Sequence, residues 1–166
     1  MDPGEHVYSL SVYAEYSQFF LGDAAFQPDI GSPAFWNPLA LQRRLAVRVR
    51  GLMGCGTARY DHVPLEVDVG PQAPPLSDLD AWQHVVEASL NLSSGGLVID
   101  GPISYQPGAS FEIRLDPGLY CVRVYYGGLD VPESDHYKLV LWPASSHGPV
   151  HVIRALDDRQ PFTASY

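Results

Sequence analysis

The chain has 166 residues, 46% of them hydrophobic, and its 19 acidic and 10 basic side chains give a formal net charge of −9 at pH 7. Because proteins bind phosphate groups with lysine and arginine, this charge argues against general binding to nucleic acids or anionic membranes and favours a basic partner. The length fits a single domain, residues 1–166, with a core large enough for folding without a metal ion or a disulfide.

Alternating apolar and polar residues predict the first strand over residues 8–16, since successive side chains of a strand point to opposite faces. Residues 17–21 are expected to extend this strand across a bulge. The segment 23–38 combines several prolines with aromatic residues, which predicts an ordered loop packed by its rings.

Residues 41–52 predict a second strand with arginine side chains on its solvent face, and residues 51–56 a glycine-rich turn. This turn lacks the Gly-Lys-Ser/Thr sequence and the following helix of a phosphate-binding loop. The basic residues of this region could instead form a site for an anion, which is the alternative to a solvent-exposed strand face. They are Arg43, Arg44, Arg48, Arg50 and Arg59.

Residues 63–69 alternate again, and Pro64 predicts an edge strand because proline cannot donate a hydrogen bond to a neighbour. Residues 71–80 have the length and composition of a crossover between strands. The same alternation predicts further strands at 85–92, 97–100, 111–115, 120–125, 137–142 and 150–155.

The connections in this second half carry turn residues. The sequence Ser93-Ser94-Gly95-Gly96 predicts a turn, and Asp116-Pro117-Gly118 predicts a hairpin. Residues 126–135 cannot continue a strand, because they include two glycines, a proline and three acids, and they form an acidic loop. Eight or nine strands in this arrangement predict an all-β fold, a single-domain two-sheet antiparallel β-sandwich.

Cys55 and Cys121 are too few for a disulfide framework, and both are expected to be reduced structural residues. Residues 1–6 lack the basic and apolar parts of a secretory signal, and no stretch approaches the ~20 apolar residues of a membrane helix. We therefore expect a cytoplasmic protein.

The sequence contains no motif that indicates catalysis or metal binding. The adjacent pairs Asp61-His62 and Asp135-His136 do not converge on one ion without a bend, because neighbours on a strand point apart. No Gly-x-Ser-x-Gly sequence accompanies the loop serines. We predict no catalytic residue, no metal and no cofactor, and expect a protein that is not an enzyme.

Aromatic residues beside the acidic loop are the main candidates for binding another protein, because aromatic anchors within a charged rim are typical of interfaces. The residues predicted to contact a partner are Tyr126, Asp130, Glu133, Asp135 and Trp142. The alternative is that these rings only cover the end of the sandwich. A second hypothesis is a β-sandwich that binds a small ligand such as a sugar, with Trp36, Trp82 or Trp142 as a stacking platform.

Two resemblances to known proteins follow from these elements. The order of elements looks like the competence protein ComJ family, with Tyr13-Ala14-Glu15-Tyr16-Ser17-Gln18-Phe19 early and the Pro-Gly turn before Tyr120 late. Residues 85–144 are similar, more closely, to uncharacterised bacterial proteins with no function attached. The matching segments are a Pro-Gly-x-Tyr-x-Val-Arg-Val turn at 117–124, a Tyr-Gly-Gly-Leu-Asp loop at 126–130 and an Asp-x-Tyr-x-Leu-x-Leu-Trp-Pro strand at 135–143.

The ComJ resemblance implies an acidic cytoplasmic protein that binds and inhibits a partner nuclease. A nuclease surface is built to hold phosphates, so an inhibitor can occupy it by presenting carboxylates. The partner implied is a basic protein, either a nuclease or a toxin for which this chain is the immunity protein. The formal charge of −9 is compatible with such a partner.

Overall fold

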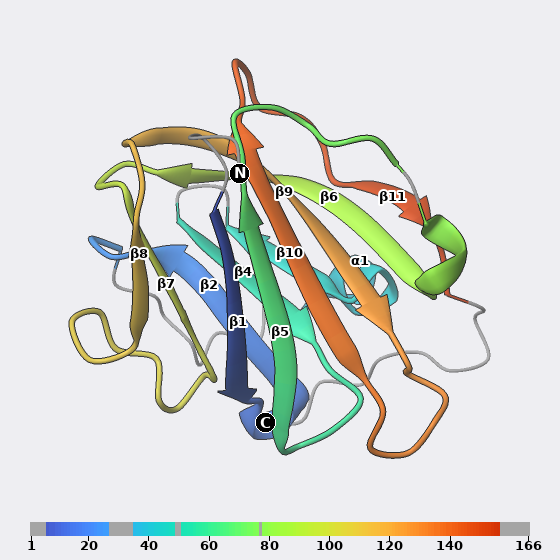
Figure 1. Ribbon diagram of the computed structural model, residues 1–166. Coiled ribbons are helices and arrows are strands. Elements are labelled where there is room, and N and C mark those ends of the chain that lie inside the picture. Colours follow the sequence, from blue (N-terminus) through green and yellow to red (C-terminus); the bar gives the residue numbers. More distant parts are fainter. Residues whose placement is uncertain (1–5, 27–34, 49–50, 77, 157–166) are drawn as a thin grey trace.

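The computed structural model describes residues 6–26, 35–48, 51–76 and 78–156, in which eleven strands form two sheets (Figure 1). The six-stranded sheet has the order β1 (His6–Tyr13), β5 (His62–Val69), β10 (His136–Pro143), β9 (Gly118–Gly127), β6 (His84–Leu92) and β11 (His151–Arg154). The five-stranded sheet has the order β3 (Leu45–Arg48), β4 (Leu52–Gly56), β2 (Gln18–Asp23), β7 (Gly96–Asp100) and β8 (Phe111–Arg114). The predicted all-β sandwich is confirmed.

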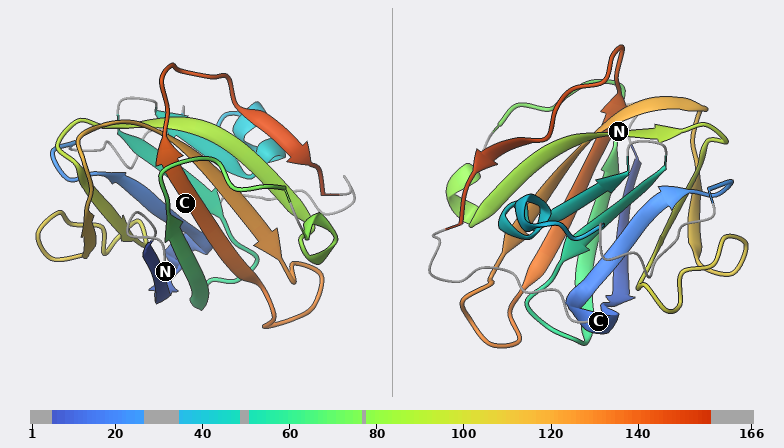
Figure 2. Two further views of the ribbon diagram at one scale, coloured as in Figure 1. Left: turned by 45° about the horizontal axis from the view of Figure 1, so that its top comes forward. Right: turned by 180° about the vertical axis from the view of Figure 1, so that it is seen from behind.

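The described strands pair antiparallel with one exception, since β5 and β10 run parallel. Figure 2 shows the six-stranded sheet lying over the five-stranded one. β9 and β10 are interior strands of their sheet and not edge strands. The single α-helix among the described elements, α1 (Pro38–Arg43), is too short to cross a membrane.

The two sheets bury a shared hydrophobic core between them. Tyr120, Val122 and Val124 of β9 point inwards, as the alternation predicts, and Phe19 and Leu21 of β2 belong to the same cluster. Burying an apolar side chain of this size stabilises the fold by ~1.5–3 kcal/mol, so alternate residues of each strand hold the two layers together.

Four connections among the described strands carry the chain from one sheet to the other, namely β1 to β2, β4 to β5, β6 to β7 and β8 to β9. Residues 17–21 do not extend β1, because the 3-10 turn η1 (Glu15–Ser17) redirects the chain, with Tyr16 and Ser17 at φ of 55° and 56°. The hairpin predicted at residues 116–118 is wrong, since β8 pairs with β7 whereas β9 pairs with β6 and β10. The turn at residues 93–96 likewise joins β6 to β7 of the other sheet.

The glycine-rich segment predicted as a turn is strand β4. On its outer face a Cβ at Gly54 would lie 2.9 Å from Phe35 and 3.1 Å from Phe20, so the missing side chain lets these rings pack onto the backbone. β5 is also an interior strand and not the predicted edge strand. Its pairing with β10 begins at Leu65, after Pro64, so the proline lies outside that ladder.

The segment predicted as a strand from residue 41 begins as helix α1. Asn37 caps the helix by accepting the Ala40 N–H at 2.9 Å, and Pro38 suits the first turn because its missing N–H would have no partner there. Arg44 ends the helix in the left-handed region, with φ of 57°. The strand prediction holds only from β3 onwards.

Trp36 packs with Phe35 and α1 against the outer face of the five-stranded sheet. Its indole N–H donates to the Gln18 side chain at 2.7 Å, and the ring is almost fully buried. Trp36 is therefore not a surface stacking platform. Residues 27–34 of the predicted loop, and Arg50 of the basic segment, lie outside the described residues.

His84 of β6 uses both ring nitrogens to hold neighbouring segments. Nε2 donates to the Arg43 carbonyl at 2.7 Å, and Nδ1 accepts the Leu156 N–H at 3.0 Å, an arrangement that needs the neutral ring. Burial lowers the pKa of His84. The hydrogen bond to Arg43 opposes this shift, and the charge of Arg44 adds to it.

We expect the protein to lose stability as the pH falls from about 7.5 to about 5. The unfolded chain protonates His84 near its ordinary pKa of about 6.5, whereas the folded chain does so only at lower pH. The contribution of neutral His84 to stability is therefore present at a pH above its ordinary pKa. It is lost as the pH falls towards the lower pKa that His84 has in the folded protein. Thermal unfolding across this range measures the loss. His84→Gln keeps a donor and an acceptor but does not titrate, so its Tm should fall less; equal falls would contradict the assignment.

Candidate functional site

Three connections meet at one end of the sandwich (Figure 1), namely residues 14–17 after β1, 57–61 between β4 and β5, and 128–135 between β9 and β10. The Ala14 N–H donates to the Asp61 carbonyl at 2.8 Å and so ties the first connection to the second. We call these three connections together the loop end.

The acidic loop is shorter than predicted and comprises residues 128–135, because Tyr126 and Gly127 still belong to β9; it is a series of turns. Gly128 has φ of 65°, and a Cβ there would collide with the Ser134 carbonyl, so only glycine fits without strain. The Leu129 N–H donates to the Gln83 side chain at 2.5 Å, which fixes the loop against the segment before β6. The exposed side chains that result include Asp130, Val131 and Glu133.

Asp135 closes the acidic loop and is only 1% exposed. Its carboxylate pairs with Arg59, accepts the Tyr137 hydroxyl at 2.5 Å and accepts the Ala58 N–H at 3.3 Å. Burial and the hydrogen bond to Asp135 raise the pKa of Tyr137, so the hydroxyl stays protonated and donates. Asp135 thus joins the acidic loop to residues 57–61.

Tyr126 belongs to β9, and its side chain is fully buried. Its ring packs edge-on against His84 and Tyr137, with centroids 5.1 and 5.8 Å away, and its hydroxyl donates to the Arg44 carbonyl at 2.5 Å. The structure places Tyr126 and Asp135 in the interior, where a partner does not reach them. Their prediction as contact residues is not retained, whereas Asp130 and Glu133 lie on the surface.

An exposed aromatic patch that the sequence did not reveal also lies at the loop end. Tyr60 is 51% exposed and Tyr13 is 39% exposed, and their ring centroids are 6.0 Å apart. Tyr16 lies 5.4 Å from Tyr60, and His62 lies 4.8 Å from Tyr13. We call these four residues the tyrosine patch. Alternation along β1 already turns Tyr13 outwards, but no local pattern links it to Tyr60.

Charge surrounds the tyrosine patch. Asp61 is exposed between Tyr60 and His62. Desolvation and the neighbouring tyrosines and Glu15 raise the pKa of Tyr60, so its phenol is neutral and can donate a hydrogen bond at neutral pH. The loop end therefore combines exposed rings with exposed carboxylates.

Trp142 does not lie at the loop end. It occupies the far end of β10 from the acidic loop, about 20 Å along an extended strand from His136. The Arg123 guanidinium covers its ring, with 4.9 Å between the guanidinium carbon and the ring centroid, and Arg123 pairs with Glu87 at 2.7 Å. The predicted grouping of Trp142 with the acidic loop is therefore not found in the structure.

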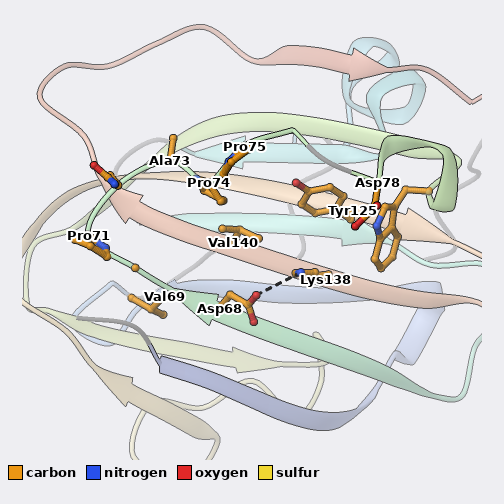
Figure 3. A pocket seen from close by; sticks show the side chains of 13 residues that line it. Asp68, Val69, Pro71, Ala73, Pro74, Pro75, Asp78, Tyr125, Lys138 and Val140 are labelled. Atoms are coloured by element: carbon orange, nitrogen blue, oxygen red, sulfur yellow. Dashed lines mark ion pairs between the residues drawn. The ribbon is translucent and has the colours of Figure 1, made fainter. Parts of the chain in front are cut away.

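A second surface feature lies on the outer face of the six-stranded sheet, beneath the crossover at residues 70–76 (Figure 3). Three hollows of about 400, 690 and 320 Å³ share Trp82 and Lys138 as lining residues. We call them the Trp82 groove. Burial alone would lower the pKa of Lys138, but the carboxylates of Asp68 and Glu66, each 3.3 Å from its ammonium, raise it.

Reactive groups are sparse among the described residues. In those residues, no three histidine, cysteine or carboxylate side chains are grouped so that they could hold a metal ion. Both cysteines are free thiols. Burial raises the pKa of Cys121 to about 11 and that of Cys55 further, so neither is a thiolate at neutral pH. The arrangement offers surfaces for binding.

Comparison with known proteins gives two solved structures with a similar fold. No protein family and no curated protein matches the chain. The crystal structure of ComJ from Bacillus subtilis, an inhibitor of the DNA degrading activity of NucA, matches with a TM-score of 0.66 at 12% identity, over 84% of this chain and 98% of ComJ. The product of crocagin biosynthetic gene J matches with a TM-score of 0.55 at 17% identity, over 84% of this chain and 97% of that one. The chain therefore has a ComJ-like fold.

Proposed function

We propose that this protein binds and inhibits a basic nuclease through the loop end. The observation that carries the proposal is the exposure, at one end of the sandwich, of the tyrosine patch together with the carboxylates of Asp61, Asp130 and Glu133. Aromatic anchors within a charged rim suit a protein interface. The fold likeness to ComJ, whose function is to inhibit a nuclease, supports the same class of function.

Electrostatics gives the proposal its mechanism. A nuclease holds phosphates with lysine and arginine, and carboxylates presented by the loop end would pair with these groups and exclude the nucleic acid. The net charge of −9 would also speed association with a basic partner. The hydrogen bonds that tie the three connections together reduce the ordering required on binding. An immunity protein for a nuclease toxin would use the same chemistry.

The test is inhibition of DNA degradation by NucA and by purified basic nucleases of the protein's own cell. Equimolar protein should suppress plasmid degradation by one of them at about 0.05 M salt, and the affinity should fall steeply by about 0.3 M salt as the charges are screened. Failure to bind or inhibit any of these nucleases at low salt would contradict the proposal.

The double variant Asp130→Asn with Glu133→Gln should weaken inhibition by about tenfold or more, because each carboxylate contributes roughly 1 kcal/mol to a close charge pair. Both residues are exposed, so the Tm should be unchanged. Glu112→Gln with Asp116→Asn is the matched control, since it changes the charge equally at exposed positions of β8 and its following turn. Equal weakening by both pairs would show that only net charge matters and would exclude the acidic loop as the contact surface.

A further inference from the structure

The outer face of the six-stranded sheet repeats one combination of groups, an aromatic ring with a cation over it and a carboxylate beside the cation. The first example is Arg123, whose guanidinium carbon lies 4.9 Å from the Trp142 ring centroid while the guanidinium pairs with Glu87. Its other hydrogen bonds go to the Tyr125 hydroxyl at 3.1 Å and the Pro74 carbonyl at 3.2 Å. Such stacking is a recognised source of affinity for cations.

The second example lies within the Trp82 groove. The Lys138 ammonium is 5.9 Å from the Tyr125 ring centroid and 3.3 Å from carboxylate oxygens of both Glu66 and Asp68. Figure 3 shows Lys138 directed towards Asp68 on the floor of the groove. The chain thus places its own cation on one of the two large rings of the groove.

The other large ring, Trp82, has a carboxylate nearby and the His136 ring centroid 5.1 Å away, but no lysine or arginine from the described part of the chain lies over it. It lies 5.2 Å from the Tyr125 ring and lines all three hollows. Asp78 lines two of these hollows, is exposed, and finds no hydrogen-bond or ion-pair partner for its carboxylate among the described residues. The ring and the acid of the repeated combination are therefore present without the cation.

The charge of the groove matches a cation. Its lining includes four carboxylates against one ammonium, a formal charge of −3 with His136 neutral; the carboxylates are Glu66, Asp68, Asp78 and Asp80. Arg154 lies 3.3 Å from Asp80 and offsets part of this charge from outside the lining residues. A guanidinium is the best fit, since it stacks flat on an indole and donates two parallel hydrogen bonds to a carboxylate.

The groove is elongated and not a closed cavity. Its hollows continue from Pro71 and Pro74 under the crossover, past Trp82, to Pro64 and His136 at the start of β10. We propose that the Trp82 groove binds an extended segment of a partner protein and takes one of its arginine side chains between the Trp82 ring and the Asp78 carboxylate. The inference does not depend on nuclease inhibition, because it concerns a different face of the molecule.

The test uses the full chain and an acetylated octapeptide of alternating glycine and arginine, labelled with fluorescein, at about 0.15 M salt. Fluorescence anisotropy should show saturable binding. Asp78→Asn should weaken it by about fivefold or more, whereas Asp116→Asn, which removes the same charge from the exposed turn after β8, should change it less than about twofold. A peptide with citrulline in place of arginine keeps the shape without the charge and should not bind.

Several results would overturn the inference. Absence of binding below about 1 mM peptide, equal effects of Asp78→Asn and Asp116→Asn, or equal binding of the citrulline peptide would each exclude recognition of arginine by this groove. If N-acetylarginine amide bound as tightly as the octapeptide, the occupant would be a small cation and not a protein segment. None of these results depends on whether the protein inhibits a nuclease, so failure of either proposal can be recognised separately.

Discussion

Replacing Asp135 with alanine is expected to lower the free energy of unfolding by about 3 kcal/mol, because the change breaks a buried ion pair and removes the acceptor of two side-chain hydrogen bonds. The groups that lose this acceptor are the Arg59 side chain and the Tyr137 hydroxyl, whereas the Ala58 N–H keeps its 2.8 Å hydrogen bond to the Tyr137 hydroxyl oxygen. The Arg59 side chain is 22% exposed, so water can solvate its charge after Asp135 is removed. The expected decrease in the free energy of unfolding is therefore at the lower end of the range for breaking a buried ion pair. Urea unfolding measured by tryptophan fluorescence provides the value.

Asp130→Ala is the control for this prediction, because it removes an acid from the same loop at an exposed position. Its effect should be within about 0.5 kcal/mol of zero. Asp135→Asn keeps the size and the acceptor for Tyr137, so it should lie between the two alanine variants. If Asp135→Ala were as stable as Asp130→Ala, the network would not hold the loop end together. Because Asp135 is structural, the binding test neutralises Asp130 and Glu133 and leaves Asp135 intact.

Alternation found the strands but not the sheet to which each belongs. The inward set on β9 and the inward set on β10 were both predictable, because burial on one face leaves a period of two in the sequence. A turn such as residues 116–118 looks the same whether it closes a hairpin or crosses to the opposite sheet. β4 was missed because Gly54 has no side chain to show the alternation, and the rings packed on it come from Phe20 and Phe35.

The site was predictable only where exposure follows from local sequence. Asp130 and Glu133 are exposed because glycine and proline turns surround them, and these signals are local. The burial of Asp135 depends on Arg59, which is 76 residues away in the chain. The tyrosine patch joins β1 to the connection before β5, and such a contact appears only after the sheet is assembled.

Tyr126 is the second residue whose replacement is expected to destabilise the fold strongly. Tyr126→Ala should lower the free energy of unfolding by about 4 kcal/mol, as expected when a fully buried aromatic ring leaves a cavity. Tyr126→Phe keeps the ring and removes only the hydroxyl that bonds the Arg44 carbonyl, so its loss should be about 1–2 kcal/mol. The hydroxyl connects β9 of one sheet to the residue before β3 of the other, and the loss therefore reports how firmly the two layers are joined.

The same pair of variants separates a structural role of Tyr126 from a role in binding. Folded Tyr126→Phe should bind a nuclease partner as tightly as the unchanged protein, because the ring is fully buried whereas Asp130 and Glu133 are exposed. Urea unfolding and the affinity of the complex are measured on the same preparations. A loss of affinity without a loss of stability would place the Tyr126 hydroxyl in the interface after all. A loss of stability without a loss of affinity is the result that its contacts with His84, Tyr137 and Arg44 require.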